Sequence, residues 1–399
     1  MRPLWILLFF AASITSSPLS AGEPSFRQAD LFTAGEAGYK LYRIPGLVVT
    51  KQGTVLAYCE ARRSDKGDWG TIDIQLRRST DGGTTWSSPV SIADVPGPRT
   101  KNPVAVAQKL ATTGEVTYNN PVMIVDRRSG AVHLLFCLEY MRCFHARSED
   151  DGQTFSRPVE ITAAFDAFRP EYDWKVLATG PSHAIQLSTG RLVVPVWLSL
   201  GTGGHAHRPS VTSTIYSDDG GASWKRGEIA VPNTAEWVNP NETVIAELAD
   251  GRVMLNTRSE SKDHRRLVTT SPDGATKWTT PRFDDELLEP VCMASLVRLT
   301  GRESDRTRLL FANPATVDVR KKVTVRLSYD EGETWPVSRM VEEGFSGYSD
   351  MAVLPTGEIL ILYERGSLDN KNPYKTGSLA LARFNLEWLS QGKDQLPAK

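Results

Sequence analysis

Cysteine and histidine are scarce in this sequence, and their scarcity limits the chemistry that the chain can carry. Its 399 residues include only four cysteines and six histidines. No two cysteines form a C-x-x-C pair, and no histidine spacing suggests a zinc site. Cys59 and Cys137 sit in apolar runs, where a buried thiol is the usual outcome. We therefore expect no metal centre and no catalytic cysteine, while a disulfide between Cys137 and Cys143 is left open.

An excess of either charge is also lacking. Lysine and arginine total 46 and the acidic residues 47, so the formal net charge is −1. Proteins that bind nucleic acids normally carry a basic bias. The balance therefore argues against a nucleic-acid partner, although it leaves room for a local basic pocket.

Long hydrophobic segments are absent apart from one short run near the N-terminus. Leu4 to Ala12 is apolar, follows Arg2, and precedes a plausible cleavage point at Ala21–Gly22. The run is too short to span a bilayer. We predict a signal peptide over residues 1–21 and no stable membrane insertion. The chain is then secreted or periplasmic, or lies in a lysosome-like compartment if it is eukaryotic.

Turn-forming residues, in contrast, are abundant and recur in a motif of the form S-x-D-x-G-x-T-W. It occurs at 79–86 (STDGGTTW), 148–155 (SEDDGQTF), 217–224 (SDDGGASW) and 328–335 (SYDEGETW), with a degenerate copy at 271–278 (SPDGATKW). The aspartate can accept hydrogen bonds from amides of its own turn, and the glycine supplies a positive φ. We predict that these residues stabilise the fold and lie away from the chemistry.

A second repeat places a glycine turn before an apolar strand. It occurs at Gly53, Gly130, Gly190, Gly251 and Gly357, with a looser sixth copy around Gly301. Six such units at intervals of about 50 to 77 residues predict six four-stranded antiparallel sheets arranged radially. The fold class is therefore all-β, a six-bladed β-propeller over residues 22–399, with no room for a separate domain.

The segment Tyr42-Arg43-Ile44-Pro45 stands just before the first blade strand. Together with the four good copies of the aspartate motif, it makes the chain resemble the sialidase family over nearly everything after residue 21. The resemblance implies a propeller that hydrolyses terminal sialic acid, a sialylated glycan as partner, and no cofactor. It implies nothing about oligomeric state or linkage preference.

The resemblance assigns three arginines to the carboxylate of sialic acid: Arg43, Arg258 and Arg320. Planar guanidinium groups suit a carboxylate better than ammonium groups do. Arg326 competes with Arg320, but it lies inside a strand that leads to an aspartate motif, so Arg320 is preferred.

The nucleophile implied by the resemblance is Tyr348, in the segment SGYSD, with Glu242 as its base. A carboxylate nucleophile would be repelled by the carboxylate of the substrate, whereas a neutral phenol is not. One strand, the Gly251 turn and the next strand separate Glu242 from Arg258. We therefore expect both to lie at the same side of one blade.

The acid is expected in the loop between Arg62 and Asp73, where three aspartates compete. Asp68 lies mid-loop, where the family places its acid, and is preferred over Asp65 and over Asp73, which falls within a strand. It would protonate the leaving oxygen and then activate water.

Further roles implied by the resemblance are less direct. Glu364 would orient Arg43, and Arg62 and Trp69 would line the pocket. Two rival functions remain: a sialic-acid-binding lectin without catalysis, and a trans-sialidase that passes the sugar to an acceptor.

Overall fold

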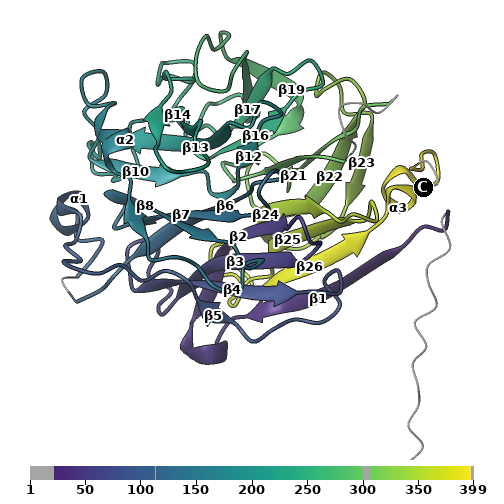
Figure 1. Ribbon diagram of the computed structural model, residues 1–399, viewed down its shortest axis with the longest axis horizontal. Coiled ribbons are helices and arrows are strands. Elements are labelled where there is room, and N and C mark those ends of the chain that lie inside the picture. Colours follow the sequence, from purple (N-terminus) through teal and green to yellow (C-terminus); the bar gives the residue numbers. More distant parts are fainter. Residues whose placement is uncertain (1–21, 113, 300–305, 397–399) are drawn as a thin grey trace, which may run out of the picture.

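The computed structural model describes residues 22–112, 114–299 and 306–396, which form six β-sheets arranged in a ring (Figure 1). Blade 1 contains β2 (Leu41–Val49), β3 (Val55–Arg62), β4 (Ile72–Ser79) and β5 (Val90–Ser91). Blade 2 contains β6 (Tyr118–Val125), β7 (Val132–Leu138), β8 (Arg142–Ser148) and β9 (Val159–Glu160). Blade 3 contains β10 (Val176–Thr179), β13 (Leu192–Ser199), β14 (Ser210–Ser217) and β15 (Lys225–Arg226).

The second half of the ring repeats this pattern. Blade 4 contains β16 (Thr243–Glu247), β17 (Val253–Thr257), β18 (Arg265–Ser271) and β19 (Arg282–Leu288). Blade 5 contains β20 (Ser295–Arg298), β21 (Leu309–Pro314), β22 (Val323–Ser328) and β23 (Val337–Met340). Blade 6 contains β24 (Ser346–Val353), β25 (Ile359–Arg365), β26 (Ser378–Phe384) and β1 (Phe26–Thr33). The short helices are η1 (Glu36–Gly38), α1 (Pro103–Ala107), α2 (Ala163–Asp166) and α3 (Leu386–Ser390).

The predicted six-bladed propeller is therefore confirmed, with two small additions. The strand β11 (Ser182–His183) pairs in parallel with β6, and β12 (Ile185–Gln186) pairs with β13. These two strands bring the sheets of blades 2 and 3 to five strands each.

The ring is closed by a strand from the start of the described chain. β1 pairs with β26 from Phe26 opposite Phe384 to Thr33 opposite Ser378, so it forms the outer strand of blade 6 (Figure 1). Because β1 leads through η1 into β2 of blade 1, its pairing with β26 ties the first blade to the last. The first strands of all six blades are thereby held around one central axis.

The aspartate motifs lie where predicted, in the turn after the third strand of blades 1 to 5. Asp150 is typical: Oδ1 accepts from the Thr154 amide at 2.9 Å, and Oδ2 accepts from the Thr154 hydroxyl at 2.6 Å. Hydrogen bonds from Thr154 and Ser148 lower the pKa of Asp150 to about 2. Blade 6 lacks the turn because its fourth strand comes from the other end of the chain.

The five glycine turns that the structure describes connect the first and second long strands of their blades. The φ angles are 89° at Gly53, 84° at Gly130, 101° at Gly190, 91° at Gly251 and 91° at Gly357. Glycine adopts this conformation without the steric cost that other residues meet. The looser sixth copy, at Gly301, and the predicted signal peptide, residues 1–21, both lie outside the described residues.

All four cysteines are free and buried. Cys137 on β7 lies directly opposite Cys143 on β8, but the two are not bonded. Within the described ranges, no helix is long and apolar enough to cross a membrane.

Two buried histidines pack between blades 2 and 3. His133 Nδ1 lies 3.0 Å from His145 Nε2, and their rings stack with centroids 5.2 Å apart. Gly221, in the aspartate motif of blade 3, approaches so closely that a Cβ there would lie 2.8 Å from His133 Nδ1. Burial and the charge of Arg147 lower the pKa of His133 to about 4, and burial, His133 and Arg147 lower that of His145 to about 3.

These depressed pKa values predict a loss of stability in acid. The unfolded chain binds protons at both histidines below about pH 6.5, whereas the folded chain resists them until about pH 4. The free energy of unfolding should therefore fall by on the order of 3 kcal/mol for each histidine as the pH drops through this window. His145→Phe keeps the stacked ring but removes one titrating group, so its melting temperature should fall less between pH 7 and pH 4.5.

The control is His264→Asn, since His264 is partly exposed and has a φ of 50°, which asparagine tolerates. It should retain the pH dependence of the wild type. An equal fall in melting temperature between pH 7 and pH 4.5 in His145→Phe and in the wild type would contradict the interpretation.

Candidate active site

A cavity of about 220 Å³ opens at the end of the ring where the first strands of the blades begin. Every blade contributes to its lining. The residues are Arg43 and Asp68 from blade 1, Asn120 and Tyr140 from blade 2, Trp197 and His207 from blade 3, Glu242 and Arg258 from blade 4, Arg320 from blade 5, and Tyr348 and Tyr374 from blade 6. The cavity therefore gathers polar groups from positions throughout the chain.

A second, larger cavity of about 290 Å³ lies where the same strands end, and apolar side chains predominate in its lining. Its buried histidine, His183, already bonds Asp350 at 2.7 Å. Arg298 is paired with Glu331. No nucleophile and base face each other there among the residues that line it, so the smaller cavity is the candidate active site.

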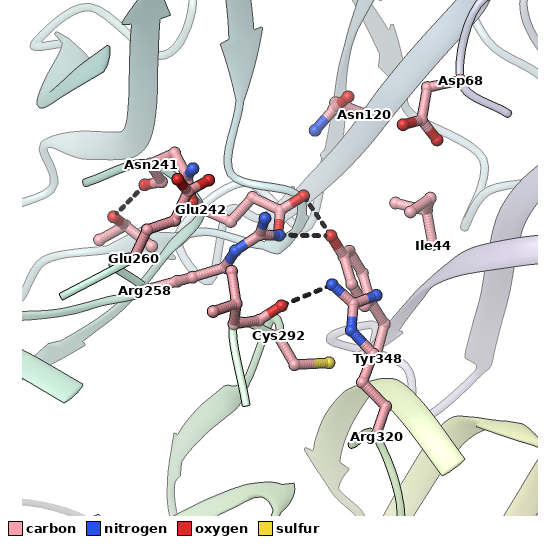
Figure 2. Close-up of polar contacts among 12 residues, drawn as sticks. Ile44, Asp68, Asn120, Asn241, Glu242, Arg258, Glu260, Cys292, Arg320 and Tyr348 are labelled. Carbon is pink, nitrogen blue, oxygen red and sulfur yellow. Dashed lines mark hydrogen bonds and ion pairs between the residues drawn. The ribbon is translucent and has the colours of Figure 1, made fainter. Parts of the chain in front are cut away.

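Tyr348, Glu242 and Arg258 form the centre of the site (Figure 2). The Tyr348 hydroxyl donates toward the Glu242 carboxylate, 2.6 Å from Oε1 and 2.5 Å from Oε2. Arg258 Nη1 donates to the same hydroxyl at 2.8 Å and also to Glu242 Oε2. A phenol paired with a carboxylate and a guanidinium is a nucleophile with a base and a cation in place.

The local fold explains this meeting. Thr243 on β16 lies opposite Thr257 on β17, so the next residues outward, Glu242 and Arg258, are neighbours. The Arg258 amide donates to the Glu242 carbonyl at 3.0 Å. The expectation that both lie at one side of a blade is confirmed by this register.

The surroundings hold the proton on Tyr348. Burial raises the pKa of its hydroxyl well above the usual value, and the negative Glu242 adds to the rise. Arg258, Arg320 and Arg43 act in the opposite direction. The tyrosine is therefore a neutral donor, and it could act as a nucleophile only if a base took its proton.

Arg43 is held by Glu364, as the resemblance implies. Arg43 Nε donates to Glu364 Oε1 at 2.9 Å, and Nη2 donates to Oε2 at 3.3 Å. Glu364 also accepts from the amides of Ile44 and Tyr348, at 3.3 and 3.2 Å. A Cβ at Gly347 would lie 2.3 Å from Glu364 Oε2, so only glycine fits there. Glu364 thus links the strands that carry Arg43 and Tyr348.

Arg320 is placed differently, because no carboxylate among the described residues forms an ion pair with it. Its Nη2 donates to the Val291 carbonyl at 2.5 Å. Its guanidinium carbon lies 4.9 Å from the ring centroid of Tyr348 and 4.5 Å from that of Tyr374. Val291 has a φ of 55°, which is strained for a β-branched residue. The charge of Arg320 is therefore the least compensated of the three arginines and is available to an anion.

Asp68 lies at the opposite side of the opening from Arg258 (Figure 2). Arg62 Nη1 is 2.8 Å from its Oδ1, and Arg43 Nη1 is 3.8 Å away. Burial would raise the pKa of Asp68, but Arg62 and Arg43 outweigh it and hold the pKa well below its usual range. Arg62 is itself fixed by Glu60, at 2.7 Å.

The competing residues lie away from the cavity. Asp65 pairs with Lys375 at 3.4 Å, and Asp73 accepts from the Tyr39 hydroxyl at 2.7 Å. Arg326 donates to Asn313 inside blade 5. Only Asp68 among the three aspartates lines the cavity.

An aromatic wall that the sequence analysis largely missed covers another side of the site. Tyr140 and His207 line the cavity, and Trp69 packs behind them at 4.6 and 5.5 Å between ring centroids. Trp197 completes the wall, and its Nε1 is buried without a hydrogen-bond partner. Burial lowers the pKa of His207 to about 4, although Asp68 raises it. Tyr140 and Trp197 lie in copies of the glycine-turn repeat, which does not show that they face a cavity, and His207 lies outside both repeats. Of the wall, only Trp69 was predicted to line the pocket.

The described part of the chain contains no cluster of three His, Cys, Asp or Glu side chains suited to a metal ion.

Known proteins resemble this chain in sequence. Residues 99–361 match the BNR repeat-like domain. The sialidase of Micromonospora viridifaciens is 30% identical, over 95% of this chain and 57% of that protein. The sialidase of Bacteroides fragilis is 32% identical, over 83% of this chain and 61% of that protein. The chain thus spans about three fifths of the length of these two relatives.

Solved structures agree in fold. A Hadza microbial sialidase is 27% identical with a TM-score of 0.73, over 91% of this chain and 69% of that one. The intramolecular trans-sialidase from Ruminococcus gnavus is 19% identical with a TM-score of 0.71, over 90% of this chain and 97% of that one. At 19% identity the second likeness concerns the fold alone. The domain match and the identity to curated sialidases establish that this chain belongs to the sialidase family.

Proposed function

We propose that this chain is an exo-α-sialidase that hydrolyses terminal α-linked sialic acids from glycans with retention of configuration. The observation that carries the proposal is the Tyr348 hydroxyl, which bonds both Glu242 and Arg258 inside a cavity that also contains Arg43 and Arg320. A lectin would need the arginines but not a tyrosine paired with a buried base.

Binding begins with the carboxylate of the substrate. Arg43, Arg258 and Arg320 supply guanidinium groups around the Tyr348 ring, and the carboxylate takes its place among them. This contact holds the adjacent anomeric carbon near the Tyr348 oxygen. It also sets the glycosidic oxygen toward Asp68 at the open side of the cavity.

In the first step the Tyr348 oxygen bonds to the anomeric carbon, and its proton passes to Glu242. Asp68 gives its proton to the glycosidic oxygen as the bond to the leaving group breaks. Arg258 Nη1 stabilises the charge that develops on the phenol oxygen.

In the second step a water molecule attacks the same carbon. Asp68, now a carboxylate, takes a proton from the water, and Glu242 returns its proton to the Tyr348 oxygen as that bond breaks. Two inversions give net retention, and the enzyme ends in its initial protonation state.

The nucleophile is tested by Tyr348→Phe. We expect the wild type to release sialic acid from 3′-sialyllactose, and the variant to lose at least about 10³-fold in kcat, because the attacking oxygen is gone. Circular dichroism and the melting temperature should be unchanged. Full turnover in the variant would rule out Tyr348 as the nucleophile.

The acid is tested by Asp68→Asn with Asp65→Asn as the matched control from the same loop. Asp68→Asn should lose about 10²-fold or more on 3′-sialyllactose, whose leaving group needs a proton. It should lose little in kcat/KM on α-sialyl fluoride, because fluoride leaves without protonation and kcat/KM does not include the later step in which Asp68 activates water. Asp65→Asn should resemble the wild type on both substrates. Equal losses of Asp68→Asn on the two substrates would contradict the role.

The low pKa of Asp68 predicts a difference between two pH profiles. In the free protein Arg62 and Arg43 keep the carboxyl ionised. A bound substrate carboxylate offsets these charges, so the pKa of Asp68 rises in the complex. The profile of kcat/KM reports the free enzyme and that of kcat the complex. The alkaline limb should therefore lie at higher pH in kcat than in kcat/KM; coincident limbs would contradict this coupling.

A further inference from the structure

Tyr374 is an exposed aromatic residue at the rim of the active-site cavity. It lies in the loop between β25 and β26, and half of its surface (50%) is exposed, whereas Tyr348 and Trp197 are buried. Its ring centroid is 4.5 Å from the guanidinium carbon of Arg320 and 5.7 Å from that of Arg43. The ring thus borders the two arginines and also faces solvent.

The Tyr374 loop contacts the loop that carries Asp68. Lys375, next to Tyr374, lies with its Nζ 3.4 Å from Asp65 Oδ2 and 3.6 Å from Asp369 Oδ2. The Lys375 carbonyl accepts from the Leu368 amide at 2.8 Å, which closes the loop on itself. Tyr374 and Asp68 are therefore neighbouring rim groups on the same side of the cavity.

The position of the acid indicates where the leaving group must lie. Asp68 has 39% of its side chain exposed, whereas Arg43, Arg320 and Tyr348 are buried. The sialic acid occupies the buried part, and the glycosidic oxygen must reach Asp68. Everything beyond that oxygen then leaves the cavity on the side where Tyr374 presents its ring.

We propose that Tyr374 contacts the sugar next to the sialic acid and is a specificity-determining residue for the leaving group. This inference rests on the proposed sialidase function. The ring offers a broad apolar face with little rotamer freedom, which suits the C–H face of a second pyranose. The preferred substrates are then sialosides with a sugar ring in this position rather than those with a small aglycone.

A different role for Tyr374 would be to hold Arg43 and Arg320 in place. That role concerns the carboxylate, which every sialoside carries. Loss of Tyr374 would then weaken all substrates, and binding of free sialic acid, by the same factor. Contact with the leaving group instead changes the ratio between substrates.

The test compares kcat/KM for 3′-sialyllactose and for methyl α-sialoside in the full chain. Tyr374→Ala should lower the ratio of the two values about tenfold, equivalent to about 1.4 kcal/mol of contact. Tyr374→Phe should keep the ratio, and so should Leu368→Ala, an exposed residue of the same loop outside the cavity lining. Competitive inhibition by free sialic acid should be unchanged in all three variants.

Two outcomes would overturn the inference while leaving the proposed function intact. They are an unchanged ratio in Tyr374→Ala, and equal losses on both substrates together with weaker inhibition by sialic acid. Inactivity of the wild type on both substrates would instead refute the proposed function itself, and the inference with it. Melting temperatures check that the exposed loop variants remain folded.

Discussion

The buried guanidinium groups of the active site determine how the residues around them are arranged. Arg43, Arg62 and Arg320 are buried, and only 14% of the Arg258 side chain is exposed. Buried charges of one sign require counter-charges, because desolvation is costly. Glu364 forms an ion pair with Arg43, and Glu242 forms one with Arg258. Arg62 is paired with both Glu60 and Asp68. The placement of each carboxylate thus follows from the arginine that it neutralises.

These groups meet only because the ring is closed. Arg43 and Glu364 come from blades 1 and 6, which are distant in sequence and adjacent in space. The pairing of β1 with β26 keeps those blades together, so a weakened closure would separate an arginine from its counter-charge. Stability of the fold and electrostatics of the site therefore depend on the same contact.

The sequence predicted those features of the structure that depend on interactions between residues close together in the chain. The aspartate motif and the glycine turns work within a few residues, so their repetition indicated the number of blades and the fold class. The expectation that Glu242 and Arg258 lie at the same side of one blade followed from the strand, turn and returning strand between them. The roles of the eight candidate residues came from a resemblance, and they stay proposals although the structure brings them together.

What the sequence did not predict depends on contacts between loops of different blades. Asp65 and Asp68 are three residues apart in one loop, and only their environments, Lys375 for one and Arg62 for the other, distinguish them. Tyr374 and His207 lie in loops outside every repeat, so nothing local marks them. Cys137 and Cys143 were correctly placed on neighbouring strands, yet facing each other did not make them a disulfide.

The net charge of the site changes when a substrate carboxylate binds. Four guanidinium groups and the four carboxylates of Glu60, Asp68, Glu242 and Glu364 cancel when all are ionised. A substrate carboxylate adds one negative charge, so its binding favours uptake of a proton.

The proton has one suitable destination. Glu242 is bonded to Tyr348 and Arg258, and Glu364 accepts hydrogen bonds from Arg43 and two backbone amides. Glu60 is fully buried against Arg62. Among these four carboxylates Asp68 is the partly exposed one, and in the proposed mechanism it lies next to the leaving oxygen. In the proposed mechanism the substrate therefore helps to generate the acid that its cleavage requires, and a strongly ionised Asp68 in the free protein is compatible with that role.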